Sequence, residues 1–257
     1  MPEGDTILRA ADRIRPVLAG TVPEEIRTPQ PRHARDRWPQ RLAGRAVTAV
    51  ESYGKHLFLH FEGDLALHSH LRMTGAWAVH PAGARWRRAP RRAWLVLRAR
   101  GAEVVQFDGP VLELMTTARR RLDQRLRALG PDLLAPRFDA DRFLARLRAD
   151  DPARPIGDAL LDQRIVAGIG NVWKAEACWG AAVDPWRRVG DVTDAEALAI
   201  VGDARPRMLR AAAEPGAAER HVYRRAGMPC RRCGATIRAH GQGDDNRTTY
   251  WCPGCQR

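Results

Sequence analysis

The first residues of the chain have the chemical character of a nucleophile beside a proton carrier. Met1 precedes Pro2, a small residue that permits removal of the initiator and leaves a secondary amine. An α-amine has a pKa near about 7.7–8.0, so part of it is neutral at pH 7. Its attack on an aldehyde carbon gives an iminium ion, a strong electron sink for elimination. Glu3 is suited to proton transfer in such a reaction, although a solvated chain end without a chemical role fits the same residues.

Four of the five cysteines form two pairs, Cys230-x2-Cys233 and Cys252-x2-Cys255, with 18 residues between them. This spacing is typical of one tetrahedral zinc ion, and four thiolate ligands leave no open position, which makes the ion structural. Two disulfides are the alternative. The N-terminal segment lacks the apolar stretch of a secretion signal, so we expect a reducing compartment and favour zinc. The fifth cysteine, Cys178, is predicted to be a small buried hydrophobe.

Gly168-Ile169-Gly170-Asn171 is a glycine-rich turn before a helical segment. A dinucleotide-binding site is disfavoured, because Trp173 stands where a small residue is needed and no suitable strand precedes the turn. Free N–H groups at the start of this helix would instead attract a phosphate, with the Asn171 amide as a second donor. An ordinary turn between helices, capped by Asn171, fits equally well.

The charge balance favours a polyanionic partner. Lys and Arg number 43 against 30 Asp and Glu, which gives a net charge of +13, and only Lys55 and Lys174 are lysines. An excess of this size is typical of nucleic-acid-binding proteins. Hydrophobic residues make up 44% of the chain, enough for a core, and no stretch reaches the roughly 20 apolar residues of a membrane helix. We therefore expect a soluble cytoplasmic protein with no membrane partner.

The elements that must position these residues change in type along the chain. Residues 6–18 repeat apolar side chains at helical spacing, with Asp5 or Thr6 as N-cap and Pro16 ending or kinking the last turn. Short strands follow, with a basic loop at 81–92. The predicted strands are Val47–Tyr53, His56–Phe61, Leu65–Leu71, Ala93–Arg98 and Glu103–Phe107. Several strands in succession favour an antiparallel sandwich.

After Thr117 the pattern becomes helical. The predicted helices are 119–129, 139–148, 156–163, 172–180 and 194–213. We therefore predict an α+β fold in three domains: an N-terminal antiparallel β-sandwich with flanking helices (1–117), a helical middle domain (118–215) and a C-terminal zinc hairpin (216–257).

Six blocks of sequence, in order, resemble the formamidopyrimidine-DNA glycosylase and endonuclease VIII family. They begin with Met1-Pro2-Glu3-Gly4 and end with the segment around Arg247 and the last two cysteines. The four between them are Gly54-Lys55-His56-Leu57, His70-Leu71-Arg72-Met73-Thr74-Gly75, Leu129-Gly130-Pro131-Asp132-Leu133-Leu134 and Leu161-Asp162-Gln163 with Gly168-Ile169-Gly170-Asn171. Each block is weak alone, but the ordered set is specific and spans residues 1 to 256.

The resemblance implies a base-excision repair enzyme that flips a damaged base out of double-stranded DNA, cleaves its glycosidic bond and nicks the strand. It implies a helix–two-turns–helix middle domain and a zinc-finger hairpin. By the same resemblance, Pro2 is the Schiff-base nucleophile and Glu3 the acid that helps open the deoxyribose. Lys55 would be a general acid or phosphate contact, and Arg247 would hold phosphates and assist the second elimination.

Further DNA contacts follow from the same resemblance. Asn171 would bind a backbone phosphate, and Arg72 and Met73 would fill the space left by the flipped base. Asp5 stands where the family commonly has a glutamate and would relay a proton beside the DNA.

The turn that carries a base-reading arginine in the purine-specific branch reads Phe107-Asp108-Gly109-Pro110-Val111, without arginine. Together with Gly4, this favours the endonuclease VIII branch and oxidised pyrimidines. The alternatives are a preference for oxidised purines, or a non-catalytic zinc-containing protein that recognises abasic or distorted sites. We expect a monomer of bacterial type acting at the nucleoid. His68 and His70 are expected to have a hydrogen-bonded structural role.

Overall fold

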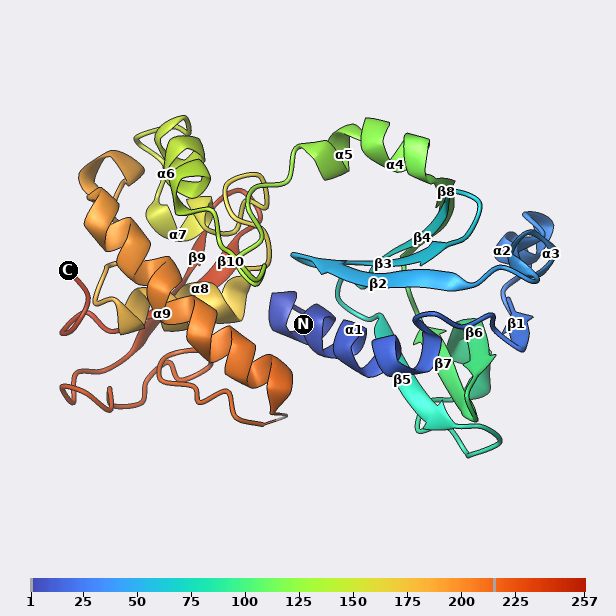
Figure 1. The fold of residues 1–257 in the computed structure, drawn as a ribbon. Helices are drawn as coiled ribbons and strands as arrows, with labels where there is room; N and C mark the ends of the chain where they lie inside the picture. Colours follow the sequence, from blue (N-terminus) through green and yellow to red (C-terminus); the bar gives the residue numbers. More distant parts are fainter. Residues whose placement is uncertain (1, 215) are drawn as a thin grey trace. The chain divides into compact units, whose positions relative to one another are not determined.

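The computed structural model describes residues 2–214 and 216–257. These residues form two compact units (Figure 1). The first comprises Pro2 and Thr6–Arg127, and the second comprises Glu3–Asp5 together with 128–214 and 216–257. The division into three domains stays a prediction, and its boundary at Pro215 lies outside the described residues.

The first helix is α1 (Gly4–Leu18), whose apolar residues at helical spacing, Ile7, Ala11, Ile14 and Leu18, are all buried. The helix begins at Gly4, so the prediction of Asp5 or Thr6 as N-cap is wrong. Pro16 lies inside the last turn and does not end the helix, because the hydrogen-bond ladder continues past it to Ala19. Proline removes one donor, and a site this close to the helix end tolerates that loss.

The first unit is an antiparallel sandwich, as predicted. One sheet has the order β2-β3-β4-β8 and the other β1-β6-β7-β5. The strands of the first sheet are β2 (Val47–Tyr53), β3 (His56–Phe61), β4 (Leu65–His70) and β8 (Val111–Thr116). Those of the second are β1 (Glu25–Arg27), β5 (Ala76–Pro81), β6 (Ala93–Ala99) and β7 (Ala102–Phe107). Residues of both sheets and of α1 share one hydrophobic core.

The three strands that the sequence did not predict, β1, β5 and β8, all lie at sheet edges. Edge position alone does not account for this, because β2 is also an edge strand and was predicted with its observed bounds. Five successive positions of β5 are half-buried, and β1 has three residues. The short helices α2 (Pro31–Arg35) and α3 (Trp38–Leu42) and the 3-10 turn η1 (Pro90–Arg92) were not predicted either.

Two short helices, α4 (Thr117–Leu122) and α5 (Gln124–Arg127), replace the single helix predicted over 119–129. The break lies at Asp123, whose carboxylate accepts hydrogen bonds from the N–H groups of Arg125 and Leu126 and so caps the second helix.

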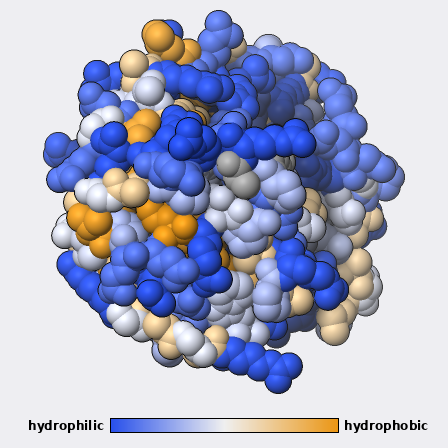
Figure 2. Space-filling view, turned by 90° about the vertical axis from the view of Figure 1, so that its right-hand side faces the viewer, coloured by the Kyte–Doolittle hydropathy of each residue, from blue (hydrophilic) through white to orange (hydrophobic). Residues whose placement is uncertain are grey.

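On the face shown in Figure 2, hydrophilic residues predominate and hydrophobic ones form small separate patches.

The second unit is helical apart from one strand pair. Its elements are α6 (Ala140–Arg148), α7 (Ile156–Ala159), α8 (Asn171–Gly180), η2 (Val189–Asp191), α9 (Asp194–Ala213), β9 (Arg238–Gln242) and β10 (Arg247–Trp251). Helix α9 has the predicted bounds, and a capping box between Thr193 and Glu196 fixes its start. Helix α7 is shorter than predicted. Helix α8 packs against α9 and β10, and it is buried along nearly its whole length. No helix of the described ranges is long and apolar enough to cross a bilayer.

Candidate active site

The carboxylate of Glu3 lies at the start of α8. It accepts hydrogen bonds from the N–H groups of Gly170 at 2.9 Å, Val172 at 2.9 Å and Trp173 at 3.2 Å, and Glu3 is only 2% exposed. Three donors and the positive end of the helix dipole stabilise its negative charge. The sequence left a phosphate and an ordinary turn open at this helix start, and the structure places an internal anion, Glu3, where the phosphate would bind.

Gly170 permits this arrangement. A Cβ at this position would overlap the carboxyl group of Glu3, so even alanine would displace the carboxylate from the N–H groups at the start of α8. The N–H of Gly4 donates to the carbonyl of Gly168 at 2.9 Å and holds the same segment from the other side. The N-cap of α8 is Gly170, so Asn171 is the first helical residue and not the cap.

Pro2 lines a cavity of about 430 Å³ in the first unit. Arg9, Arg13 and Arg88 contribute cationic side chains to the same cavity, and Met73 contributes an apolar one. The lining is therefore suited to an anionic ligand with an apolar part. Met1, whose removal the proposed amine requires, lies outside the described residues.

Met73 projects from a tight loop after β4. Its side chain is 62% exposed, one of few large hydrophobic side chains exposed among the described residues. The N–H of Gly75 donates to the carbonyl of Leu71 at 2.9 Å and closes the loop, and a Cβ on Gly75 would lie 2.8 Å from that oxygen. Arg72, also exposed, has a φ of 48°. The loop thus presents Arg72 and Met73 to solvent.

Lys55 occupies the turn between β2 and β3, where Gly54 has a φ of 55°. His56 follows it and pairs across the sheet with His70. Burial lowers the pKa of His56 to about 2 and that of His70 to about 4, and the charge of Lys55 contributes to both shifts. The two imidazoles are therefore neutral at pH 7, beside a cationic turn.

His68 has the structural role that we expected. It is buried, and its Nε2 lies 2.8 Å from Nδ1 of His56 while its Nδ1 lies 3.5 Å from a carboxylate oxygen of Glu113. His70 accepts a hydrogen bond from the N–H of Arg72 and so supports the Met73 loop. Asp5 lies half-buried in the first turn of α1.

Asn171, on helix α8, contacts the strand β10 that carries Arg247. The Nδ2 group of Asn171 donates to the carbonyl of Thr248 at 2.8 Å, which ties α8 to β10. Arg247, one residue earlier on β10, is 40% exposed and pairs with Asp245 at 3.2 Å. Asn171 itself is buried, so the structure adds a positioning contact to its predicted phosphate contact.

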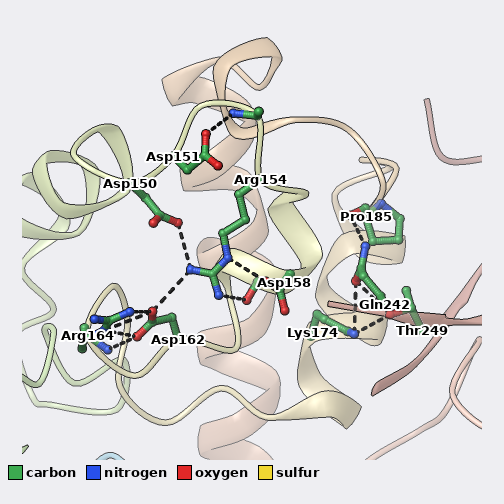
Figure 3. Close-up of polar contacts among 11 residues, drawn as sticks. Asp150, Asp151, Arg154, Asp158, Asp162, Arg164, Lys174, Pro185, Gln242 and Thr249 are labelled. Atoms are coloured by element: carbon green, nitrogen blue, oxygen red, sulfur yellow. Dashed lines mark hydrogen bonds and ion pairs between the residues drawn. The ribbon is translucent and has the colours of Figure 1, made fainter. Parts of the chain in front are cut away.

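Lys174 is a buried residue to which the sequence assigned no role. Its ammonium group donates to Thr249 Oγ1 at 2.6 Å and to Gln242 Oε1 at 3.5 Å, joining α8 to both strands of the hairpin (Figure 3). Burial lowers its pKa from 10.5 to about 8. The only signal in the sequence was its rarity among 41 arginines.

We expect this shift to make stability depend on pH. Between about pH 8 and 10.5 the unfolded chain binds more protons than the folded one, so stability should rise with pH by about 3 kcal/mol. Lys174→Met should lack this rise. Urea unfolding of the wild-type and Lys174→Met proteins, both loaded with metal, gives the free energy of unfolding of each at several pH values in that range. Contributions from other titrating groups cancel in the difference between the two proteins. Parallel profiles would contradict the assignment.

Beside Lys174, Arg154 bridges three carboxylates, those of Asp150, Asp158 and Asp162 (Figure 3). Burial raises the pKa of Asp162, but hydrogen bonds from Arg164 and Arg154 outweigh it and lower the pKa to about 2. This network stabilises the turns around α7.

Glu176 is a second residue that the sequence did not indicate. It is 1% exposed and accepts hydrogen bonds from the N–H groups of His221, Val222 and Tyr223 and from Arg207. It therefore fixes the segment after α9 to α8. Nothing in the local sequence distinguishes it from a surface glutamate, because its partners lie more than 30 residues away.

The four paired cysteines form one cluster. Their sulfur atoms all lie within 4.8 Å of one another, with Cys230 and Cys255 3.8 Å apart and Cys233 and Cys252 3.4 Å apart. Tetrahedral zinc with Zn–S bonds of about 2.3 Å places sulfurs about 3.8 Å apart, so the set fits a metal ion better than two disulfides.

Two thiols differ in character. Burial raises the pKa of Cys230, but the indole N–H of Trp179 and the N–H of Arg232 outweigh it and lower the pKa to about 6. Cys178 is fully buried, and burial raises its pKa to about 12, so it is the inert hydrophobe that we predicted.

Comparison with known proteins agrees with this geometry. Residues 1–111 match the family model of the formamidopyrimidine-DNA glycosylase N-terminal domain, and residues 129–222 match that of the formamidopyrimidine-DNA glycosylase H2TH domain. The chain belongs to the formamidopyrimidine-DNA glycosylase family. The first match contains Pro2, Lys55 and the Met73 loop, and the second contains α6 to α9; the four cysteines follow both.

Among relatives in this family, "Probable endonuclease 8 2" of Streptomyces coelicolor is 42% identical, over 100% of this chain and 94% of its own length. "DNA-(apurinic or apyrimidinic site) lyase Nei2" of Mycolicibacterium smegmatis is 37% identical, over 100% of this chain and 99% of its own length. These names support the endonuclease VIII branch that the sequence favoured.

A solved structure of the formamidopyrimidine-DNA glycosylase fold also matches. It is a complex between Lactococcus lactis Fpg and DNA containing an abasic site, with a TM-score of 0.83, 24% identity and 100% coverage of both chains. At this identity the match demonstrates a shared fold.

Proposed function

We propose that this protein is a bifunctional DNA glycosylase and abasic-site lyase of base-excision repair. One observation carries the proposal: Pro2 lines a cationic cavity beside Met73, and the carboxylate of the next residue is fixed by three N–H groups at the start of α8. Catalytic groups must be held in place by their surroundings, and these two are. The names of the relatives support the same activity.

The reaction proceeds through the Pro2 nitrogen. Its lone pair forms a bond to C1′ of a flipped deoxyribose, and the base leaves with the electrons of the glycosidic bond. Glu3 accepts the proton that the Pro2 nitrogen loses and transfers it to the ring oxygen as the sugar opens. The resulting iminium ion accepts the electrons of the C2′–H bond as its proton passes to water, and the 3′ phosphate departs by β-elimination. A second elimination releases the 5′ phosphate.

Other residues serve the DNA around this step. Lys55 acts as a general acid or a phosphate contact, Arg247 holds the flanking phosphates, and Asn171 binds a backbone phosphate. Arg72 and Met73 fill the space that the flipped nucleotide leaves, which offsets a few kcal/mol of lost stacking. Asp5 relays a proton beside the DNA.

The four cysteines hold one structural zinc ion. All four donors are thiolates, so the bound ion supplies cross-linking of the two knuckles and has no position for water or substrate. Figure 3 shows Lys174 bonded to both strands of the same hairpin, which supports Arg247 from the other end.

Loss of the metal should weaken DNA binding without unfolding the sandwich. Cys252→Ser should reduce affinity for abasic duplex by about tenfold or more, because Arg247 loses its support and phosphate contacts dominate affinity. Fluorescence anisotropy measures binding, and far-UV circular dichroism measures the sheet. Cys178→Ala, which removes a thiol outside the cluster, should bind normally. Normal binding by metal-free protein would contradict the role of the hairpin.

The preferred lesion is proposed to be an oxidised pyrimidine, on the basis of Gly4 and the arginine-free turn at 107–111, with oxidised purines as the alternative. We also propose a monomer that acts in the cytoplasm at the nucleoid. A lesion panel scored for base release, together with the elution volume on a sizing column, tests these points.

Borohydride trapping tests the function itself. Reduction of the iminium during turnover should link the protein covalently to abasic and thymine-glycol duplexes, visible as a slower band on a denaturing gel. A non-catalytic binder of abasic sites, the second candidate, would bind the same duplexes and give no adduct.

A further inference from the structure

Lys174 is a fully buried cation whose hydrogen-bond partners are neutral. It is 0% exposed, and its ammonium group donates to Thr249 Oγ1 at 2.6 Å and to Gln242 Oε1 at 3.5 Å (Figure 3). No ion pair to Lys174 occurs within the described ranges 2–214 and 216–257. An apolar side chain of similar size would join α8 to the hairpin at least as stably, because it needs no removal of a charge from water. Packing alone therefore does not explain a cation at this position.

The contacts of Lys174 lie on the part of the hairpin that carries Arg247. The Thr249 hydroxyl donates to Gln242 Oε1 at 2.8 Å and lies 3.4 Å from the carbonyl oxygen of Arg247, and Gln242 is the cross-strand partner of Arg247. Side chains two residues apart on a strand, and those of a cross-strand pair, project from the same face. Arg247 therefore projects on the side of Lys174, at the end of the strand, where it is 40% exposed.

Lys174 and Arg247 also interact through their charges. The charged and titratable groups that face Lys174 come from four elements: Glu3 before α1, Asp158 on α7, Cys178 on α8 and Arg247 on β10. Burial lowers the pKa of Lys174 to about 8, and the charge of Arg247 lowers it further while those of Glu3 and Asp158 raise it. The two cations therefore repel each other, and an anion bound by Arg247 would relieve that repulsion.

We propose that Lys174 is a positioning residue that holds Arg247 toward a DNA phosphate, and that binding of this phosphate is linked to protonation of Lys174. The inference rests on the proposed function, in which Arg247 holds the phosphates beside the flipped nucleotide. The phosphate offsets the repulsion between the two cations, so bound DNA favours the protonated form of Lys174. Because linkage is reciprocal, protonation of Lys174 favours DNA binding by the same factor.

The linkage predicts how affinity depends on pH. Well below about pH 8, Lys174 carries its proton in the free protein, so DNA binding takes up none there. Above that pH the free protein has lost the proton and must take one from the buffer on binding, so affinity falls by up to about tenfold per pH unit. A lysine that only anchored the hairpin, without contact to the field of the phosphate, would give no such proton uptake.

Fluorescence anisotropy with a duplex that carries a tetrahydrofuran abasic analogue, which cannot be cleaved, tests the linkage. Between about pH 7 and 9.5 the affinity of the zinc-loaded wild-type protein should fall about tenfold further than that of Lys174→Arg, whose guanidinium stays charged throughout. The Pro2 amine titrates in the same range, but it is present in both proteins and cancels in the ratio of their affinities. Parallel profiles would overturn the linkage.

A double-mutant cycle at pH 7 tests the positioning. Lys174→Met and Arg247→Ala should each weaken binding about tenfold and each reduce the slope of log affinity against log salt by about one. The double variant should bind no more weakly than either, because both changes remove the same phosphate contact. Lys174→Met with Arg72→Ala is the matched control, and these effects should multiply, because Arg72 belongs to the other unit.

Zinc content and far-UV circular dichroism equal to wild type confirm that the hairpin of each variant is intact. Multiplying effects of Lys174→Met and Arg247→Ala, or affinity of Lys174→Met within about twofold of wild type, would overturn the positioning role. Neither assay involves chemistry, so a protein that shows the coupling but gives no borohydride adduct would refute the proposed function alone. An adduct together with parallel pH profiles and multiplying effects would refute this inference alone.

Discussion

An uncleaved N-terminal tag should abolish the borohydride adduct, and Pro2→Gly should slow base release by about 10²-fold or more. In the tagged chain the Pro2 nitrogen is part of a peptide bond and has no free lone pair. In Pro2→Gly the nitrogen is a primary amine, and its iminium can lose the N–H proton and become a weaker electron sink. Single-turnover base release and adduct yield measure both effects.

The matched control is the tagged protein after proteolytic removal of the tag. Removal should restore the adduct, and mass spectrometry of the active material should find the initiator methionine absent. Duplex affinity should change little among the three proteins, because Pro2 contributes no charge-assisted phosphate contact in this proposal. Full activity with Met1 retained would exclude the Pro2 nitrogen as the nucleophile.

Glu3→Gln should reduce base release by about 10²- to 10⁴-fold, the usual contribution of a positioned acid or base. The amide has nearly the shape of the carboxylate and keeps one oxygen for the N–H groups of α8, so the fold should persist. It can neither give nor take the proton that opens the sugar. Release from a thymine-glycol duplex under single-turnover conditions measures the loss.

The second step separates this effect from a general loss of function. On a preformed abasic site, where the sugar opens spontaneously, Glu3→Gln should still form the adduct. Glu24→Gln, which alters an exposed carboxylate in the first unit, should leave both steps unchanged. Base release at the wild-type rate by Glu3→Gln would show that the buried carboxylate serves only to cap α8.

The sequence predicted those elements whose patterns are set locally. Strands β2 and β3, which form a hairpin, and helix α9, which has its own capping box, were predicted with their observed bounds. Strands β1 and β5 were missed because β1 has three residues and five successive positions of β5 are half-buried, so neither alternates clearly. Strand β8 alternates in burial and was missed nonetheless. Pro16 was predicted to end or kink the last turn, and the helix continues past it to Leu18.

The residues of the site were likewise predicted where their signal is local in the sequence. Residue order and cysteine spacing indicated Pro2, Glu3 and the metal cluster. The contacts of Lys174 and Glu176 depend on partners 31 to 75 residues away, which no local pattern encodes. The glycine turn before α8 allowed a phosphate at the helix start, but the structure places the Glu3 carboxylate there.

Strand β10 and the residue directly after it contribute three side chains with different roles. Arg247 begins it, Thr249 turns inward to Lys174, and Cys252 completes the cluster directly after it. Successive side chains on a strand point to opposite faces, so one inserted residue would exchange every inward and outward position before the insertion. Length variation among natural homologues should therefore be confined to the turn at 243–246, where extra residues alter neither the face of Arg247 nor the reach of the cysteines.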